Sequence, residues 1–268
     1  MRKKARVEKH NTRIAIIFVI FVCVVILISI LFKAIQLVGQ SKFDGSNRFT
    51  ISVSNDKNLE VISFSPNKHS ISILKIDGEI KDLKAERFLK IPIDGFVRGS
   101  FLKTDKDVAS LMSSVFFGFK DTKTNLNIVD ILRLILSSRT TPANNLLVYN
   151  ITSSMEEQKV YKIVEKLFKD DEIEKENQTV EIVNTTEVLG LGGRLARFIT
   201  NMGGNVIQVS TENKLEKNSY VLYTGRKTYT VKRLNEVLGF KLVQMDKKKF
   251  IADIRVVLGE DAKDPSSF

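Results

Sequence analysis

The chain has 268 residues, and its 42 Lys and Arg residues outnumber 31 Asp and Glu residues to give a formal net charge of +11. A single cysteine, Cys23, excludes internal disulfides, and only two histidines exclude zinc centres built on several histidines. Carboxylates alone could hold a metal ion, but no spacing in the sequence supports such a site. We therefore expect neither a metal nor another cofactor.

An unbroken apolar run, Ile14–Phe32, predicts a membrane-spanning helix. Its 19 uncharged residues reach about 28 Å at the helical rise, enough to cross the hydrocarbon core of a bilayer. Six basic residues and one acid precede the run, and by the positive-inside rule they keep residues 1–13 in the cytoplasm. A cleaved signal peptide is the alternative, but no Ala-x-Ala-like site follows the run. We therefore expect a single-pass plasma-membrane protein with an uncleaved signal-anchor and an extracytoplasmic C-terminal part.

Beyond the apolar run, 236 residues with a net charge of +6 remain, enough for two small domains. A mild positive excess suits a surface that faces anionic phospholipid or acidic wall polymer, and it equally suits plain solubility. Nucleic acid is not an expected partner, because the strongest basic cluster lies in residues 1–13, where membrane topology explains it.

Strand and helix candidates follow the apolar run in chain order. Residues 33–48 are expected to be a polar juxtamembrane spacer. Alternation at 49–53 predicts a half-buried strand, and 59–64 and 71–76 predict a hairpin. A helix is expected to start near Thr104, where Thr104 and Asp107 resemble a capping pair. A second helix is expected over 127–136, and because it is apolar nearly all round we expect it to be buried. A strand at 146–151 precedes a helix that opens with a capping box at 154–157, and the charged residues 170–177 mark the domain boundary.

The C-terminal pattern is strand, helix, strand, strand, helix, strand. The strands are expected at 180–183, 206–209, 220–223 and 251–258, with helix faces that include Leu191–Ile199 and Tyr229–Leu238. Glycines end both helices. The predicted fold class is therefore α/β: an N-terminal transmembrane helix followed by two small extracytoplasmic α/β domains at 49–177 and 178–259, then a disordered tail at 260–268.

A glycine-rich loop joins the strand at 180–183 to the following helix. It holds Asn184, Gly190, Gly193 and Arg194, and backbone N–H groups at a helix N-terminus can bind an anion. The order is neither G-x-G-x-x-G nor a P-loop. A tight turn, in which glycines permit positive φ, explains the same residues and stays open as the alternative.

A second candidate site surrounds the apolar stretch 91–96. Lys90 and Arg98, with Lys103, could balance the phosphates of a lipid-linked pyrophosphate while the apolar residues take the prenyl chain. Asp77 and Glu79 could bind Mg²⁺, although Asp-Gly at this position also indicates a solvated turn.

Three sequence blocks carry a family resemblance. Residues 180–186 read V-E-I-V-N-T-T, Gly203-Gly204 precede a strand, and 252–259 read A-D-I-R-V-V-L-G. In this pattern residues 178–259 resemble the LytR C-terminal domain, which follows the catalytic part of many LytR-CpsA-Psr (LCP) cell-envelope proteins. Thr185 stands where glycine is usual, and Gly192-Gly193 where alanine is common. The resemblance implies a bacterial protein of the cell envelope.

Residues 49–177 resemble a degenerate LCP domain. Val61–Pro66 is similar to the family's strand that ends in Asn-Pro, and Ile73–Glu79 occupies the place of its Ser-Ile-Pro-Arg-Asp motif. Family members transfer glycopolymers from polyprenyl pyrophosphate to peptidoglycan. Here the catalytic arginine falls on Gly78, and the acid expected near Asn58 has no aligned counterpart. Without an arginine to neutralise the pyrophosphate, efficient transfer is not expected, and no catalytic residue is assigned.

The sequence thus predicts a membrane-anchored, non-catalytic binding or scaffolding protein of the cell envelope. The lipid bilayer is its partner through Ile14–Phe32. Peptidoglycan, an anionic wall polymer or another envelope protein is the expected partner outside. The alternative is a phosphotransferase acting on polyprenyl-pyrophosphate-linked glycopolymer, with Lys75, Lys90 or Arg98 replacing the missing arginine.

Overall fold

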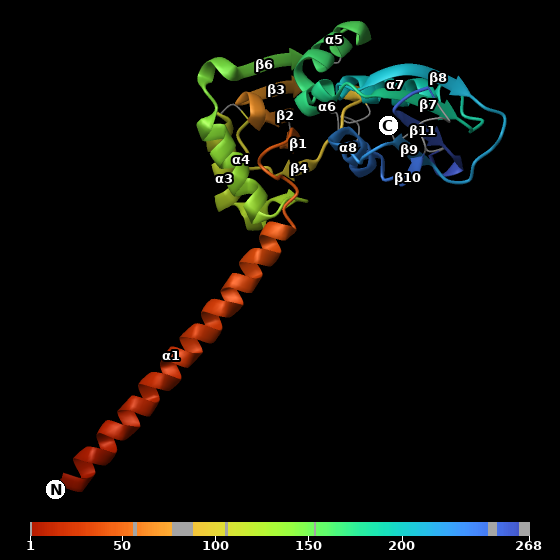
Figure 1. The fold of residues 1–268 in the computed structure, drawn as a ribbon. Coiled ribbons are helices and arrows are strands. Elements are labelled where there is room, and N and C mark those ends of the chain that lie inside the picture. The colour runs from red at the N-terminus through yellow and green to blue at the C-terminus, as the bar shows by residue number, and fades with distance from the viewer. Residues whose placement is uncertain are drawn as a thin grey trace.

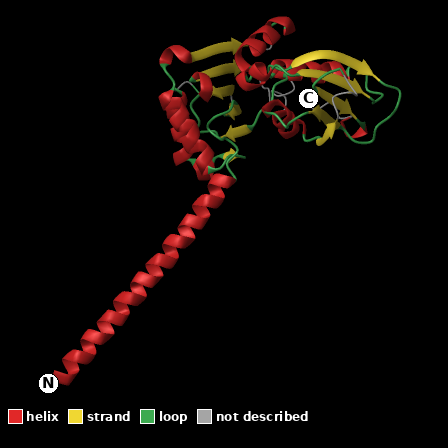
Figure 2. Ribbon diagram, viewed as in Figure 1, coloured by secondary structure: helices red, strands yellow, loops and turns green. Residues whose placement is uncertain are grey.

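The structure is a computed structural model that describes residues 2–55, 58–76, 88–104, 107–152, 154–245 and 251–262. A long N-terminal helix leads to two groups of strands, each accompanied by helices (Figures 1 and 2). The mixed α/β class with two sheet-containing domains is thereby confirmed.

Helix α1 spans Arg2–Gly39 and extends away from the rest of the described chain (Figure 1). Its part Ile14–Gly39 is long and apolar enough to cross a membrane, and its side chains are exposed, as an anchor in lipid requires. The helix runs seven residues past the predicted end at Phe32. The predicted spacer at 33–48 is therefore wrong, since its first half is helical and Phe43 is buried against Phe49 at a ring distance of 5.0 Å.

The first sheet has six strands in the order β5-β4-β1-β2-β3-β6. The strands are β1 Phe49–Ser54, β2 Leu59–Ser65, β3 Ser70–Ile76, β4 Gly95–Arg98, β5 Lys123–Thr124 and β6 Leu146–Ile151. Strands β1, β2 and β3 are antiparallel neighbours, whereas β4 runs parallel to β1 and β6 parallel to β3. Strands β4 and β5 were not predicted, because both are too short to show a pattern.

Helices cover both faces of this sheet. On one face, α3 (Val108–Phe117) and α4 (Ile128–Thr140) pack against Ile51, Ile62 and Ile73. On the other face, α5 (Glu157–Phe168) packs against Val61 and Leu74. The first strand is consequently buried along its whole length, and the predicted half-buried strand at 49–53 is wrong about its polar face, where Thr50 bonds to Ser63.

Two helix starts differ from prediction in their caps, and a third helix differs in its burial. Helix α3 begins at Val108, where the Asp107 carboxylate accepts from Ser110 N, so Thr104 is not its cap. The predicted capping box at 154–157 is wrong, because α5 begins at Glu157 and has no side-chain cap. Helix α4 has a true capping box between Asn127 and Asp130, but its expected burial all round is wrong, since Leu132 and Leu136 are exposed.

The second sheet has five strands in the order β10-β9-β11-β7-β8. The strands are β7 Thr179–Asn184, β8 Asn205–Thr211, β9 Tyr220–Thr224, β10 Lys241–Met245 and β11 Ile254–Leu258, and the helices are α7 Leu191–Asn201 and α8 Tyr229–Leu238. Strand β10 was not predicted, and β11 begins three residues later than expected. Helix α7 packs so closely on β8 that a Cβ at Gly192 would lie 2.9 Å from Val209.

The ends of the second domain are more ordered than predicted. Residues 260–262 form a 3-10 turn in which Ala262 is buried and the Asp261 carboxylate accepts from Ser219 N at 2.8 Å, so the predicted disorder is wrong there. At the predicted boundary, residues 170–177, the chain forms a short helix α6 (Asp171–Glu176) packed beside α8. The domain limits themselves stay a prediction.

A buried carboxylate fastens the end of α1 to the first domain. Asp130 Oδ1 accepts from Ser41 Oγ at 2.6 Å and from Phe43 N at 2.9 Å, while its Oδ2 accepts from Asn127 N at 2.8 Å. Arg133 donates to Phe43 O and to Ser41 Oγ. The chain that leaves the anchor is therefore fixed to the start of α4.

We predict that Asp130→Ala lowers the free energy of unfolding by about 3 kcal/mol, because three donors lose their buried acceptor. Chemical denaturation of the full chain in detergent measures the change. The exposed Asp121→Ala is the matched control and should cost less than about 0.5 kcal/mol. Equal effects of the two variants would show that the Asp130 bonds add no stability.

Candidate functional site: the cleft between the two sheets

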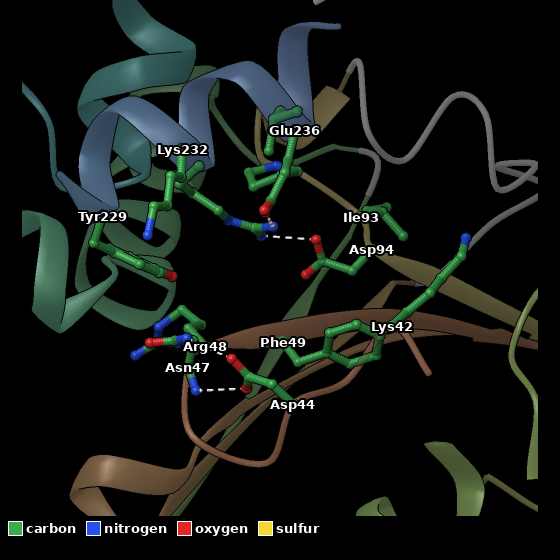
Figure 3. Close-up of a pocket in the computed structure, with 13 residues that line it drawn as sticks. Lys42, Asp44, Asn47, Arg48, Phe49, Ile93, Asp94, Tyr229, Lys232 and Glu236 are labelled. Carbon is green, nitrogen blue, oxygen red and sulfur yellow. Dashed lines mark hydrogen bonds and ion pairs between the residues drawn. The ribbon is translucent and has the colours of Figure 1, made fainter. Parts of the chain in front are cut away.

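A cleft of about 650 Å³ lies where α8 of the second domain meets the segments before β1 and β4 of the first (Figure 3). Most of its lining is polar or charged. The lining residues are Lys42, Asp44, Asn47, Arg48, Phe49, Pro92, Ile93, Asp94, Tyr229, Lys232, Arg233, Glu236 and Val237. Both domains contribute, so the cleft exists only while they stay together.

An ion pair between Asp94 and Arg233 joins the two domains at this cleft. Arg233 Nη2 donates to Asp94 Oδ1 at 2.7 Å, and the side chains are only 12% and 10% exposed. Asp94 Oδ2 in turn accepts from Thr50 N at 2.8 Å, which fixes the carboxylate to β1. Burial opposes the charge of Arg233, but the adjacent Asp94 carboxylate outweighs it and raises the arginine pKa. Helix α8 is thus held on the first sheet by a charged, directional contact.

Arg48 lines the cleft and donates to neutral acceptors rather than to a carboxylate. Its Nη1 donates to Ser63 Oγ and to Leu167 O, each at 2.9 Å. Burial lowers the pKa of Arg48, although the nearby charges of Asp171 and Asp170 oppose that shift. The guanidinium therefore stabilises the junction through neutral acceptors and longer-range attraction.

Two carboxylates at the ends of α6, those of its N-cap Asp170 and of Glu176, bind the N-terminal turn of α8. Tyr229 Oη donates to Asp170 Oδ2 at 2.7 Å, and burial together with the Asp170 charge raises the pKa of the phenol. Glu176 accepts from Tyr229 N at 2.9 Å and from Thr230 N at 2.7 Å. Burial opposes the Glu176 charge, but the bonds from Thr230 outweigh it and lower the carboxyl pKa. A carboxylate at this end of α8 is also favoured by the helix dipole.

The remaining cations of the cleft are exposed. Lys232 lies on α8, and Lys42 lies across the cleft beside Phe49 (Figure 3). Within the described chain neither lysine has a carboxylate at ion-pair distance, whereas Asp44 accepts from Ser46 N and Asn47 N in its own turn. Glu236 also lines the cleft, where it is 66% exposed and pairs with Arg233 at 3.8 Å, so the lining has only a small excess of positive over negative groups.

Lys90 lies at a second contact between the domains. It has a left-handed φ of +51° and donates to Tyr161 Oη at 2.8 Å, while Asn201 Nδ2 of α7 donates to Lys90 O at 2.9 Å. The Arg197 guanidinium lies 4.2 Å from the Tyr161 ring centre. Burial, and then the Arg197 charge, lower the Lys90 pKa. This predicted site residue is thus engaged in the interdomain contact.

The other predicted pyrophosphate ligands lie apart from Lys90. Arg98 ends β4, and Lys75 lies on β3, where it pairs with Glu60 at 3.2 Å. Two strands separate β4 from β3, so the two backbones are roughly 14 Å apart at the usual strand spacing. Gly78, Asp77 and Glu79 lie outside the described residues.

The glycine-rich loop is organised by its own side chains. Asn184 Oδ1 accepts from Thr186 N at 3.1 Å and its Nδ2 donates to Val188 O, so both ends of the amide are used within the loop. Gly190 has φ +75° and precedes α7, and Gly193 faces open space. Arg194 Nε and Nη2 are buried and have no hydrogen-bond partner among the described residues. These four predicted residues share one loop and helix start, away from the cleft.

Sequence reasoning missed the cleft. Its residues come from three separate segments, 42–49, 92–94 and 229–237, and no spacing along the chain connects them. One signal was available: on α8, Tyr229, Arg233 and Glu236 fall at helical spacing beside the apolar face.

The family comparison matches only the second domain. Residues 177–261 match the family model described as LytR cell envelope-related transcriptional attenuator, and the predicted resemblance over 178–259 to the LytR C-terminal domain is thereby confirmed. The match spans less than half of the chain. The LCP resemblance of residues 49–177 stays a prediction, and comparison with curated proteins gives no match.

Several solved structures are similar in part. The transcriptional regulator YvhJ from Bacillus subtilis is 15% identical with a TM-score of 0.36, over 45% of this chain and 97% of that one. TagV from B. subtilis is 11% identical with a TM-score of 0.33, over 47% and 97%. Lin1025 from Listeria innocua is 9% identical with a TM-score of 0.29, over 40% and 83%. At these TM-scores the likeness supports no argument about function.

We predict that Arg233→Ala lowers the free energy of unfolding by about 3–5 kcal/mol, because it leaves the Asp94 charge buried and unpaired. Lys232→Ala, on the same helix but exposed, should change it by less than about 0.5 kcal/mol. Denaturation of Arg233→Ala, Asp94→Ala and the double variant in detergent measures the coupling between the two side chains. Additive effects would contradict a direct interaction.

Glu176 should make stability depend on pH. Its pKa is lower folded than unfolded, so the extra stability is complete above the unfolded value of about 4.3 and is lost as the pH falls through the lower folded value. We expect Glu176→Gln to be less stable than wild type at pH 7, and the difference to shrink below about pH 4. Thermal unfolding against pH tests this, with the exposed Glu187→Gln as control. A difference in stability between Glu176→Gln and wild type that does not change with pH would rule out the Glu176 charge as its cause.

Proposed function

We propose that this chain, which carries a LytR C-terminal domain over residues 177–261, is a single-pass cell-envelope protein that binds an anionic wall polymer without altering it chemically. Helix α1 would anchor it in the plasma membrane. The two domains, held together at the cleft, would form the binding body outside. This proposal keeps the family's setting in the envelope and assigns this chain a binding role.

The charges around α1 support the orientation. Arg2, Lys3, Lys4, Arg6, Lys9 and Arg13 precede the apolar segment, against one acid, Glu8. Short basic segments stay on the cytoplasmic side of the membrane, so both sheets would face outward.

The observation that carries the binding role is the unequal engagement of charges in the cleft. Asp94 is paired with Arg233 and bonded to β1, Asp44 is bonded within its own turn, and Glu236 is paired with Arg233 at 3.8 Å. Lys42 and Lys232 are exposed and have no carboxylate at ion-pair distance among the described residues. Exposed lysines that flank a cleft attract a phosphate- or carboxylate-bearing polymer by charge. The positive excess of the exported part adds to this attraction.

The groups around the cleft whose pKa values are shifted favour binding over catalysis. Tyr229 has its pKa raised by burial and by Asp170, so it remains a protonated donor at neutral pH. The Asp170 carboxylate bonds to Tyr229 and caps α6, where it accepts from Glu172 N. Neither group is arranged to transfer protons near pH 7. The phosphotransferase alternative is not favoured, because Lys75, Lys90 and Arg98 are spread over separate contacts.

Co-sedimentation of the purified full chain with bacterial wall sacculi tests the binding role. We expect sacculi that retain their anionic polymer to bind more protein than sacculi from which acid has removed it. Lys42→Glu with Lys232→Glu should weaken this binding. Lys214→Glu with Lys241→Glu makes the same change in net charge at exposed positions outside the cleft lining and should bind almost as wild type. Equal binding by both double variants would overturn the assignment of the cleft.

The orientation has its own test. Protease added to cells whose outer layers have been removed should digest the two domains while residues 1–13 stay protected. Digestion of the N-terminal residues with the domains protected would reverse the assigned topology. A cysteine-reactive, membrane-impermeant label on Lys214→Cys gives an independent measurement, because native Cys23 lies within the apolar run.

A further inference from the structure

Three exposed phenylalanines occur at the same edge of the first domain. Phe96 on β4 is 37% exposed, Phe101 in the following loop is 40% exposed, and Phe117 at the end of α3 is 86% exposed. Lys120 and Lys123 are exposed in the segment that follows α3. We call these five residues the basal edge. Exposed large aromatic side chains beside lysines are typical of surfaces that contact lipid.

The order of strands places this edge next to the anchor. Strand β5 is one end of the sheet and β6 the other, with β4 beside β5. Figure 1 shows β6 farthest from α1, and then β3, β2, β1 and β4 progressively nearer to it. The basal edge is therefore the side of the domain from which α1 departs.

Hydrogen bonds connect the basal edge to the end of α1. Phe96 N donates to Asn125 Oδ1 at 2.8 Å, and two residues later Asn127 Nδ2 donates to Leu37 O at 2.9 Å. The Phe101 ring lies against Gly118, where a Cβ would approach it to 2.5 Å, so Phe101 lies at the C-terminal end of α3, the helix that ends with Phe117. The segment from α3 to α4 thus carries the basal edge down to the membrane helix.

The length of the apolar helix sets the height of this edge above the lipid. Ile14–Gly39 has 26 residues and reaches about 39 Å, whereas the hydrocarbon core is about 30 Å thick and each headgroup layer adds about 5–8 Å. With Ile14 at the inner boundary of the core, Gly39 lies at about the outer surface of the headgroups. The residues bonded to Leu37 are then at lipid level.

From this geometry we propose that the basal edge rests on the outer headgroup layer of the same bilayer that α1 spans. Phe101 and Phe117 enter the interface with their rings, and Lys120 and Lys123 bind anionic phospholipid headgroups. The domain then lies on the membrane rather than swinging above it, since Asp130 fixes the end of α1 to α4. The inference rests on the membrane span and is independent of polymer binding in the cleft.

Tryptophan fluorescence tests the contact directly, because the chain contains no native Trp. Phe117→Trp and Phe101→Trp are each reconstituted as full chain into vesicles of phosphatidylcholine with phosphatidylglycerol, half of them made with brominated acyl chains. We expect blue-shifted emission and loss of fluorescence in the brominated vesicles. Leu147→Trp, exposed on β6 at the opposite edge of the same sheet, should keep its fluorescence.

Further variants distinguish contact with lipid from insertion of α1 alone and from contact with a second copy of the chain. Phe21→Trp inside α1 reports insertion, so quenching there with none at Phe117→Trp would overturn the surface contact while leaving the membrane anchor intact. Lys120→Glu with Lys123→Glu should reduce the quenching of Phe117→Trp in the anionic vesicles. No reduction would overturn the role of anionic headgroups. A blue shift that grows with protein concentration and resists brominated lipid would mean that a second copy covers the edge, which also overturns the proposal.

Discussion

The ion pair between Asp94 and Arg233 holds together the two domains that follow helix α1. It brings α8 of the second domain onto β1 and β4 of the first at 2.7 Å, in a setting where neither charge is well solvated. A buried pair of this kind is directional and intolerant of losing one partner. Tyr229, held by Asp170, and Asn201, bonded to Lys90 O, extend the same junction. The cleft lies beside these contacts, between the two domains.

The attachment of α1 is the second constraint. Because Asp130 accepts from Ser41 and Phe43, the chain has almost no free length between the helix and α4. A rigid connection fixes the height and the facing of the first domain relative to lipid. The contact proposed between the basal edge and lipid depends on this connection.

The elements that the sequence predicted correctly are those whose patterns are long and local. The hairpin at β2 and β3, helix α7 with its glycine cap, and the closing strand β11 all read directly from periodicity and turn residues. Strand β5 has only two residues and β4 only four, too few for a pattern, and β10 was missed although it has five. The interpretation of 33–48 as a polar spacer missed the burial of Phe43, because that side chain is packed by Phe49 and Phe64 and its backbone N–H donates to the distant Asp130.

The sequence by itself determined the apolar N-terminal helix, the α/β class and the LytR C-terminal resemblance of residues 178–259, because each depends on residues adjacent in the chain. Tertiary structure alone decided the cleft and the basal edge. Asp94 and Arg233 are 139 positions apart, and Phe96 is connected to helix α1 through Asn125 and Asn127. Contacts between distant segments follow from how sheets and helices pack, and no local pattern of residues encodes them.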